Sequence, residues 1–160
     1  MKIPTNLKHK PVICIEDYAK IDGKYANETD AQGLSLGLAQ WNDRGIVDIS
    51  AKIWRHSGEK WSRQSEEMPM HRVLDLAIMI CKTYAYFKEA YRVPGLFDPE
   101  KPEVGAIELQ GAKSALNVCT DNAMIKGDIQ LFAQALNDEG ERLGERFRVL
   151  AAAIKEAGYD

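Results

Sequence analysis

The stretch LSLGLAQWNDRGIVDISAKIW, residues 34–54, decides the fold. A four-residue hairpin loop at residues 42–45 places three apolar pairs on one face of a sheet: Leu38 with Ile49, Leu36 with Ala51 and Leu34 with Ile53. A slip of one residue would turn all of these side chains to the other face, so the register is strongly specified. We therefore predict an antiparallel hairpin that buries the aliphatic residues and leaves Ser35, Gly37 and Ser50 on the opposite face.

Residues 31–41 are also compatible with a helix that Asp30 would cap. Four apolar residues would then share one helical face: Ala31, Leu34, Leu38 and Trp41. We favour the strand because only a strand gives the paired apolar positions across the loop.

Further strands are expected on both sides of this hairpin. Residues 12–15 form a short apolar run after Pro11, which is typical of a buried strand. A two-residue loop, Ser57-Gly58, would bring Trp54 opposite Trp61 and Lys52 opposite Arg63. Strands near 34–41, 46–56 and 59–65 would then form an antiparallel meander.

The remainder of the chain is predicted to be mainly helical. Residues 68–92 carry apolar residues at helical spacing and end at Val93-Pro94-Gly95, and residues 104–118 suggest a second helix. From Asp128 to Ala157, eight residues recur every 3.5 positions: Ile129, Ala133, Leu136, Gly140, Leu143, Phe147, Leu150 and Ile154. We expect this seam to be buried against residues 70–91, in a helix that is either continuous or broken after residues 137–139.

The predicted fold class is therefore α+β. We expect a single domain, residues 1–160, with a sheet-rich part at 1–67 and a helical part at 68–160. A three- or four-stranded antiparallel meander would pack on a helical layer that includes the long C-terminal helix.

Composition limits the protein class. The chain has 160 residues, of which 45% are hydrophobic and 28% charged, which suits one globular domain. A net charge of −3 argues against a dedicated nucleic-acid binder. The longest apolar run, residues 76–81, is far shorter than the ~20 residues of a membrane span. The N-terminus also lacks a secretory signal pattern. We therefore expect a cytoplasmic protein. Cys14, Cys81 and Cys119 form no CxxC pair and are expected to be reduced and mostly buried.

Two quoted stretches carry a resemblance to a known family. They are DISAKIWRHSGEKWSRQSEEMPMHRVLDLA at residues 48–77 and LSLGLAQWN at residues 34–42. Together they resemble a family of small uncharacterised bacterial proteins. The resemblance implies a bacterial, cytosolic protein and transfers no catalytic or binding residue.

The main candidate ligand site is one face of the meander, with Lys52, Trp54, Trp61 and Arg63. Two tryptophan rings supply a flat apolar surface, and two opposed basic residues would favour an anion or an acidic protein segment between them. The alternative is that this face is packed in the core, with the tryptophans as ordinary buried residues.

Other candidate chemistry is weaker. Glu66, Glu67, His71 and Asp75 could act as acid–base or metal-binding groups, although no second histidine or cysteine ligand lies nearby. Cys119 is the one cysteine that the sequence places outside an apolar stretch. No phosphate-binding, dinucleotide-binding, calcium-loop or serine-hydrolase motif occurs. We therefore predict no catalytic residues, no metal site and no identifiable cofactor.

Three function classes remain. The first is a non-catalytic binding or interaction protein that uses the Trp/basic hairpin face. The second is a structural protein that forms homo-oligomers through the C-terminal seam. The third is an enzyme without a recognisable motif, centred on His71.

Overall fold

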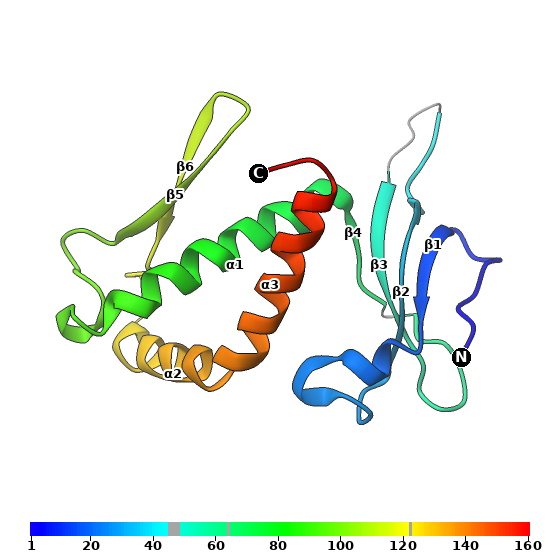
Figure 1. The fold of residues 1–160 in the computed structure, drawn as a ribbon, viewed down its shortest axis with the longest axis horizontal. Coiled ribbons are helices and arrows are strands. Elements are labelled where there is room, and N and C mark those ends of the chain that lie inside the picture. The colour runs from blue at the N-terminus through cyan, green and yellow to red at the C-terminus, as the bar shows by residue number, and fades with distance from the viewer. Residues whose placement is uncertain (45–48, 64, 122) are drawn as a thin grey trace. The chain divides into compact units, whose positions relative to one another are not determined.

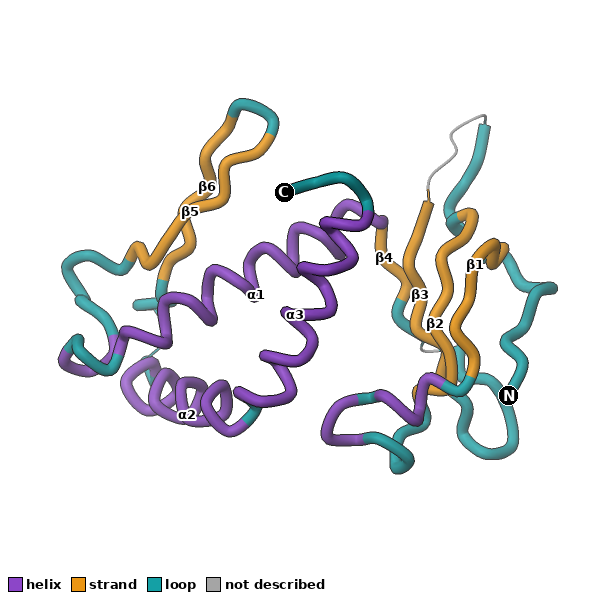
Figure 2. The backbone as a smooth tube through the Cα atoms, viewed as in Figure 1, coloured by secondary structure: helices purple, strands orange, loops and turns teal. Residues whose placement is uncertain are grey.

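The computed structural model describes residues 1–44, 49–63, 65–121 and 123–160, and it has the α+β class expected (Figures 1 and 2). Its strands are β1 (Lys10–Glu16), β2 (Ala31–Leu38), β3 (Ile49–Arg55), β4 (Glu67–Pro69), β5 (Glu103–Leu109) and β6 (Ala112–Asn117). Its helices are α1 (Met70–Ala90), α2 (Ile125–Asp138) and α3 (Gly140–Glu156), with short 3-10 turns at Tyr18–Ile21, Gly23–Tyr25 and Pro94–Leu96. The chain divides into two compact units, Met1–Asp75 and Leu76–Asp160.

The first unit contains a four-stranded antiparallel sheet in the order β1-β2-β3-β4 (Figure 1). Residues 31–38 form a strand, so the helical alternative is wrong. The predicted β2–β3 register is confirmed: Leu38 lies opposite Ile49, Leu36 opposite Ala51 and Leu34 opposite Ile53. Residue 45, the last position of the predicted loop, and residues 46–48, the first three positions of the predicted next strand, lie outside the described residues.

The predicted burial of the two sheet faces is wrong. Ser35 and Ser50 are buried, and Trp54 on the same face is 1% exposed. On the opposite face Leu36 is 41% exposed and Leu38 is 42% exposed. The physical reason is that the N-terminal segment covers the serine face, where His9 hydrogen-bonds both serines. A polar face with partners for its hydroxyl groups can form a core.

The turn after β3 also differs from the prediction. His56 forms a bridge with Trp61, and the N–H of Ser57 donates to the carbonyl of Lys60 at 2.9 Å. The loop is therefore two residues longer than the one predicted, and Trp54 does not lie directly opposite Trp61. The predicted strand at 59–65 is replaced by this bridge and by β4, and Glu67 of β4 takes the position opposite Lys52. The predicted pairing of Lys52 with Arg63 is therefore wrong.

The N-terminal strand β1 forms where it was expected, but it is not buried. Val12 is 70% exposed and Ile13 is 64% exposed. β1 is an outer strand of the sheet and has a bulge between Pro11 and Ile13. An edge strand has a neighbour on only one side, which explains why its apolar run is not covered.

In the second unit, the predicted helix at 104–118 is a β-hairpin. β5 and β6 pair antiparallel, with Leu109 opposite Ala112. The two residues between them, Gln110 and Gly111, have φ angles of 53° and 74°. Two successive positive φ angles are the geometry of a tight hairpin turn whose twist matches the strands. The tight turn therefore determines the secondary structure of this segment, although its apolar residues also have a weak helical spacing.

The C-terminal periodic segment is broken where the sequence allowed it. α2 ends at Asp138 and α3 begins at Gly140, close to the predicted break. The rings of Tyr84 and Phe147 lie 5.2 Å apart, so the seam contacts α1 as expected. The C-terminal end of the seam, at Leu150 and Ile154, is exposed, contrary to the expected burial.

Candidate functional site

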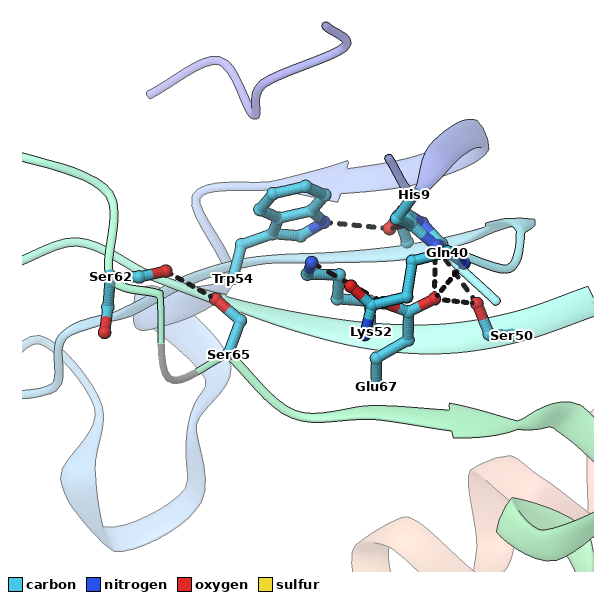
Figure 3. A network of polar contacts seen from close by, with 9 residues as sticks. His9, Gln40, Ser50, Lys52, Trp54, Ser62, Ser65 and Glu67 are labelled. Carbon is cyan, nitrogen blue, oxygen red and sulfur yellow. Dashed lines mark hydrogen bonds and ion pairs between the residues drawn. The ribbon is translucent and has the colours of Figure 1, made fainter. Parts of the chain in front are cut away.

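The best-defined cluster of polar side chains lies on the serine face of the sheet, around His9 (Figure 3). The His9 residue is 1% exposed. Its Nε2 lies 2.9 Å from Oγ of Ser35, and its Nδ1 lies 3.0 Å from Oγ of Ser50 and 3.2 Å from Oε1 of Glu67. His9 just before β1 is thus bound to side chains of β2, β3 and β4.

The directions of these hydrogen bonds follow from the groups that can only donate. The indole Nε1–H of Trp54 donates to Oγ of Ser35 at 2.8 Å, which leaves the Ser35 hydroxyl to donate to Nε2 of His9. The Ser50 hydroxyl donates to Oε1 of Glu67 at 2.7 Å. The arrangement assigns the proton of a neutral His9 to Nδ1, where it is donated towards Ser50 and Glu67.

Glu67 connects this hydrogen-bond network to a buried ion pair. Its Oε1 also accepts the backbone N–H of Gln40 at 3.0 Å, and its Oε2 lies 3.6 Å from Nζ of Lys52. The Lys52 side chain is 11% exposed, and its Nζ lies 4.3 Å from the centroid of the Trp54 ring. The ammonium group is therefore held between a carboxylate and an aromatic face.

The protonation states agree with this geometry. Burial lowers the pKa of His9, and the neighbouring Glu67 carboxylate only partly opposes that effect. Burial alone would raise the pKa of Glu67, but hydrogen bonds from Ser50, Gln40 and His9 hold it below the ordinary value. A neutral imidazole therefore lies beside an ionised carboxylate.

Ser35, His9 and Glu67 are arranged in the order of a serine–histidine–acid relay, but the surroundings favour a structural role. The Ser35 hydroxyl already accepts from Trp54 and donates to His9, and both Ser35 and His9 are buried. A nucleophile must meet its substrate, but Ser35 is only 5% exposed and His9 only 1% exposed. The network fastens the N-terminal segment to the sheet.

The opposite face of the same sheet is apolar, and no described element of the first unit covers it. It holds a groove of about 410 Å³, lined by aliphatic residues that include Ile13, Leu34, Leu36, Ile53, Met68 and Val73. Its two charged lining residues both have partners. Glu66 binds the guanidinium of Arg55, with Nη2 to Oε1 at 2.7 Å and Nε to Oε2 at 3.1 Å, and Lys52 binds Glu67.

The structure brings together three of the four residues predicted to bind a ligand. The Trp54 and Trp61 rings meet edge to face at 6.2 Å, and Lys52 lies over Trp54. Arg63 is exposed. Because Trp54 is buried, its ring offers no free face for stacking. Ligand binding by these residues stays a prediction.

The remaining candidates are dispersed. Glu66 and Glu67 have different partners, and His71 is exposed on α1. Across the described ranges, no three His, Cys, Asp or Glu side chains cluster as metal ligands would. The cysteines Cys14, Cys81 and Cys119 are all exposed, so their expected burial is wrong.

Two features were missed by sequence reasoning: the role of His9 and the open apolar face. A single histidine before a strand carries no spacing signal, because its partners are 26 to 58 residues away. The apolar face was recognised as a set of residues, but alternation does not indicate which face will be covered.

Comparisons with known proteins add a family and no activity. Within the described part of the chain, no helix has the length and apolar character that crossing a membrane requires. No curated protein and no solved structure matches the sequence. A family model matches residues 1–159, and the chain therefore belongs to DUF6530, a family of unknown function.

Proposed function

We propose that this protein is a non-catalytic interaction module that binds an amphipathic helix of a partner protein on the apolar face of its four-stranded sheet. The observation that supports this is the contrast between the two faces. One face is closed by a hydrogen-bonded network around His9, and the other exposes Ile13, Leu36 and Leu38 beside a groove. Contiguous exposed aliphatic surface marks binding sites on soluble proteins.

The chemistry of the groove supports an apolar occupant. Both charged residues that line it are already paired, Glu66 with Arg55 and Lys52 with Glu67, so no free charge is available to recognise an ionic ligand. An apolar sheet face is commonly covered by a helix with one apolar stripe. A partner helix would contact the groove through its apolar residues at positions i, i+3, i+4 and i+7.

The test uses a dye-labelled model peptide of Leu and Lys in which Leu recurs at positions i, i+3, i+4 and i+7, so that it forms an amphipathic helix. We expect it to bind the full chain, and a scrambled peptide of the same composition to bind at least tenfold more weakly. Leu36→Asp should reduce binding at least tenfold, because it places a charge in the apolar face.

Leu109→Asp provides the matched control, since Leu109 is a comparably exposed leucine on β5, outside the groove. Circular dichroism on both variants establishes that each is folded. Equal binding by the two variants, or equal binding of the scrambled peptide, would contradict the proposal.

A second candidate function is self-association through the C-terminal seam. The exposed Leu150 and Ile154 at the end of α3 favour it. Ile154→Asp should then lower the sedimentation coefficient of an oligomer, whereas Leu36→Asp should not.

A cytoplasmic location in a bacterium is part of the proposal, supported by three exposed free cysteines and by the family resemblance.

A further inference from the structure

The segment before β1, residues 1–9, is held on the serine face of the sheet by two buried side chains. Ile3 is 7% exposed and lies against Gly33, where an added Cβ atom would come within 2.5 Å of Cγ2 of the isoleucine. His9 is hydrogen-bonded to Ser35 and Ser50. The other residues of the segment are exposed or half-buried, so Ile3 and His9 make its buried contacts with the sheet.

The start of β1 gives this segment a place to turn. Lys10 and Pro11 begin the strand, but Pro11 has no N–H to donate to β2. The register with β2 shifts between Pro11 and Ile13 and is regular from Ile13 onward. The segment can therefore leave the sheet as far as the bulge while the regular part of β1 stays paired.

His9 is the contact that responds to pH. In its neutral form, Nε2 accepts the hydroxyl proton of Ser35, whose oxygen accepts the indole N–H of Trp54. A proton on Nε2 turns this acceptor into a donor and leaves the Ser35 hydroxyl hydrogen without an acceptor. An unsatisfied buried hydroxyl and a buried positive charge then both disfavour the closed arrangement.

The one carboxylate that contacts His9 among the described residues is already shared. Glu67 of β4 lies between His9 and Lys52 of β3, at 3.2 Å from Nδ1 of His9 and 3.6 Å from Nζ of Lys52 (Figure 3). β2 has no charged residue, and Lys8 and Lys10 beside His9 are both exposed. Protonation of His9 would thus place two buried cations on one carboxylate. Burial lowers the pKa of His9, and Lys52 adds to that effect while Glu67 opposes it.

We propose that protonation of His9 releases residues 1–9 from the serine face, so that this segment acts as a pH-sensitive strap over the sheet. The strap lies on the face opposite to the groove and does not depend on the helix-binding function proposed above. In the released state His9 is in water and titrates as an ordinary histidine, whereas in the closed state it resists protonation. The equilibrium constant for release therefore rises as the pH falls below 6.5, by at most about tenfold per pH unit.

A thiol introduced at position 3 measures the release. The test uses the full chain with Ile3→Cys and with serine in place of its three natural cysteines, which are exposed. The rate of labelling by N-ethylmaleimide is divided by the rate for the same protein in concentrated urea at the same pH, which removes the effect of pH on the thiol itself. We expect this ratio to rise at least threefold from pH 7 to pH 5.

Two substitutions at histidine test whether His9 is the titrating group. His9→Gln should leave the labelling ratio constant within about twofold, because glutamine does not titrate. His71→Gln is the matched control, since His71 is exposed, and should keep the full rise. A ratio that does not change between pH 7 and pH 5 in the parent protein would overturn the proposal.

A lysine substitution tests the shared carboxylate and remains informative if His9→Gln does not fold. Lys52→Met leaves Glu67 free to pair with a protonated His9, so the rise in labelling should fall to less than half. Lys60→Met, at an exposed lysine in the turn after β3, should leave the rise unchanged. An undiminished rise in both His9→Gln and Lys52→Met would overturn the proposal.

Dependence on urea distinguishes release of the strap from unfolding of the whole first unit. Release exposes little surface, so at pH 5 the labelling ratio should change little at urea concentrations below the unfolding transition. The ratio for Ala90→Cys, which replaces Ile3→Cys at a residue 1% exposed in α1, should not rise between pH 7 and pH 5. Labelling at position 3 that increases with urea as steeply as global unfolding does would overturn the proposal.

Discussion

At the scale of single residues, the core of the first unit contains hydrogen-bonded polar side chains as well as apolar ones. His9, Ser35 and Ser50 are buried, and each finds a partner within 3.0 Å. A satisfied buried network contributes modestly to stability, but removing one member leaves the others without partners and costs far more. The side chains around His9 should therefore be sensitive to substitution and to pH.

The stability of the protein should fall when the pH is lowered from 7 to 5. Burial depresses the pKa of His9 below its ordinary value of 6.5, so below pH 6.5 the unfolded chain binds a proton that the folded chain does not. The free energy of unfolding then decreases with falling pH, by at most about 1.4 kcal/mol per pH unit for this one group. Urea unfolding between pH 7.5 and 5 measures the slope. This range stays above 4.5, below which Glu67 protonation would add a second loss.

His9→Gln should flatten this dependence, because glutamine does not titrate and can still form hydrogen bonds. His71→Gln is the control, since His71 is exposed. A free energy that does not change between pH 7 and 5, or a slope unchanged in His9→Gln, would contradict the expectation.

The buried pair of Lys52 and Glu67 gives a second prediction. Glu67→Gln keeps an oxygen that can accept from Ser50 and Gln40, but it leaves the Lys52 ammonium without a carboxylate. We expect a loss of about 3 kcal/mol in the free energy of unfolding. The double variant Lys52→Met/Glu67→Gln should lose less than the sum of the single variants, because no charge is then left unpaired.

The control for the Lys52–Glu67 pair is Glu103→Gln. Glu103 and Lys113 form an exposed pair at 4.0 Å, and removing its charge should cost less than about 0.5 kcal/mol. Additive losses in the double variant would show that Lys52 and Glu67 do not interact.

At the scale of elements, the sequence allows the β2–β3 register to be predicted but not which face is covered. The register depends on local information, namely the loop length and the alternation of aliphatic residues. Which face of the sheet is covered depends on His9 and Glu67, which contact Ser50 and are 41 and 17 residues away from it in the sequence. Small hydroxyl residues in a strand are typical of a solvent-exposed face, and the local sequence does not show that distant residues will bind them.

The β5–β6 hairpin shows a different reason for failure. The predicted helix rested on the spacing of Val104, Ile107, Ala112, Ala115 and Leu116, so apolar periodicity alone favoured the wrong element. The turn carried the correct signal, since Gly111 readily adopts a positive φ and follows Gln110 between two short runs. The sequence left open whether the periodic helix is continuous or broken near Gly140, and the structure has the break, between α2 and α3.

At the scale of the whole molecule, α1 is the element that crosses the boundary between the two compact units. Its first residues, Met70–Asp75, belong to the first unit and the rest to the second. Helix formation is cooperative along a chain, so the melting of one end of α1 affects the other. The continuity of α1 should therefore couple the unfolding of the two units.

This coupling can be measured with probes that report on different units. All three tryptophans lie in the first unit, at positions 41, 54 and 61, whereas α2 and α3 lie in the second. Tryptophan fluorescence and circular dichroism at 222 nm should therefore give coincident urea transitions in the natural chain. Leu76→Pro removes a helical hydrogen bond at the boundary and clashes with the preceding turn, at a cost of roughly 3 kcal/mol. We expect the two transitions to separate in this variant.

Leu76→Ala is the matched control for Leu76→Pro, because it also removes the leucine side chain but preserves the helix. Its two transitions should remain coincident, although both shift to lower urea. If Leu76→Pro also unfolds in one coincident transition, the coupling does not pass through α1. Transitions that are already separate in the natural chain would show that a continuous helix is not enough to make the two units unfold together.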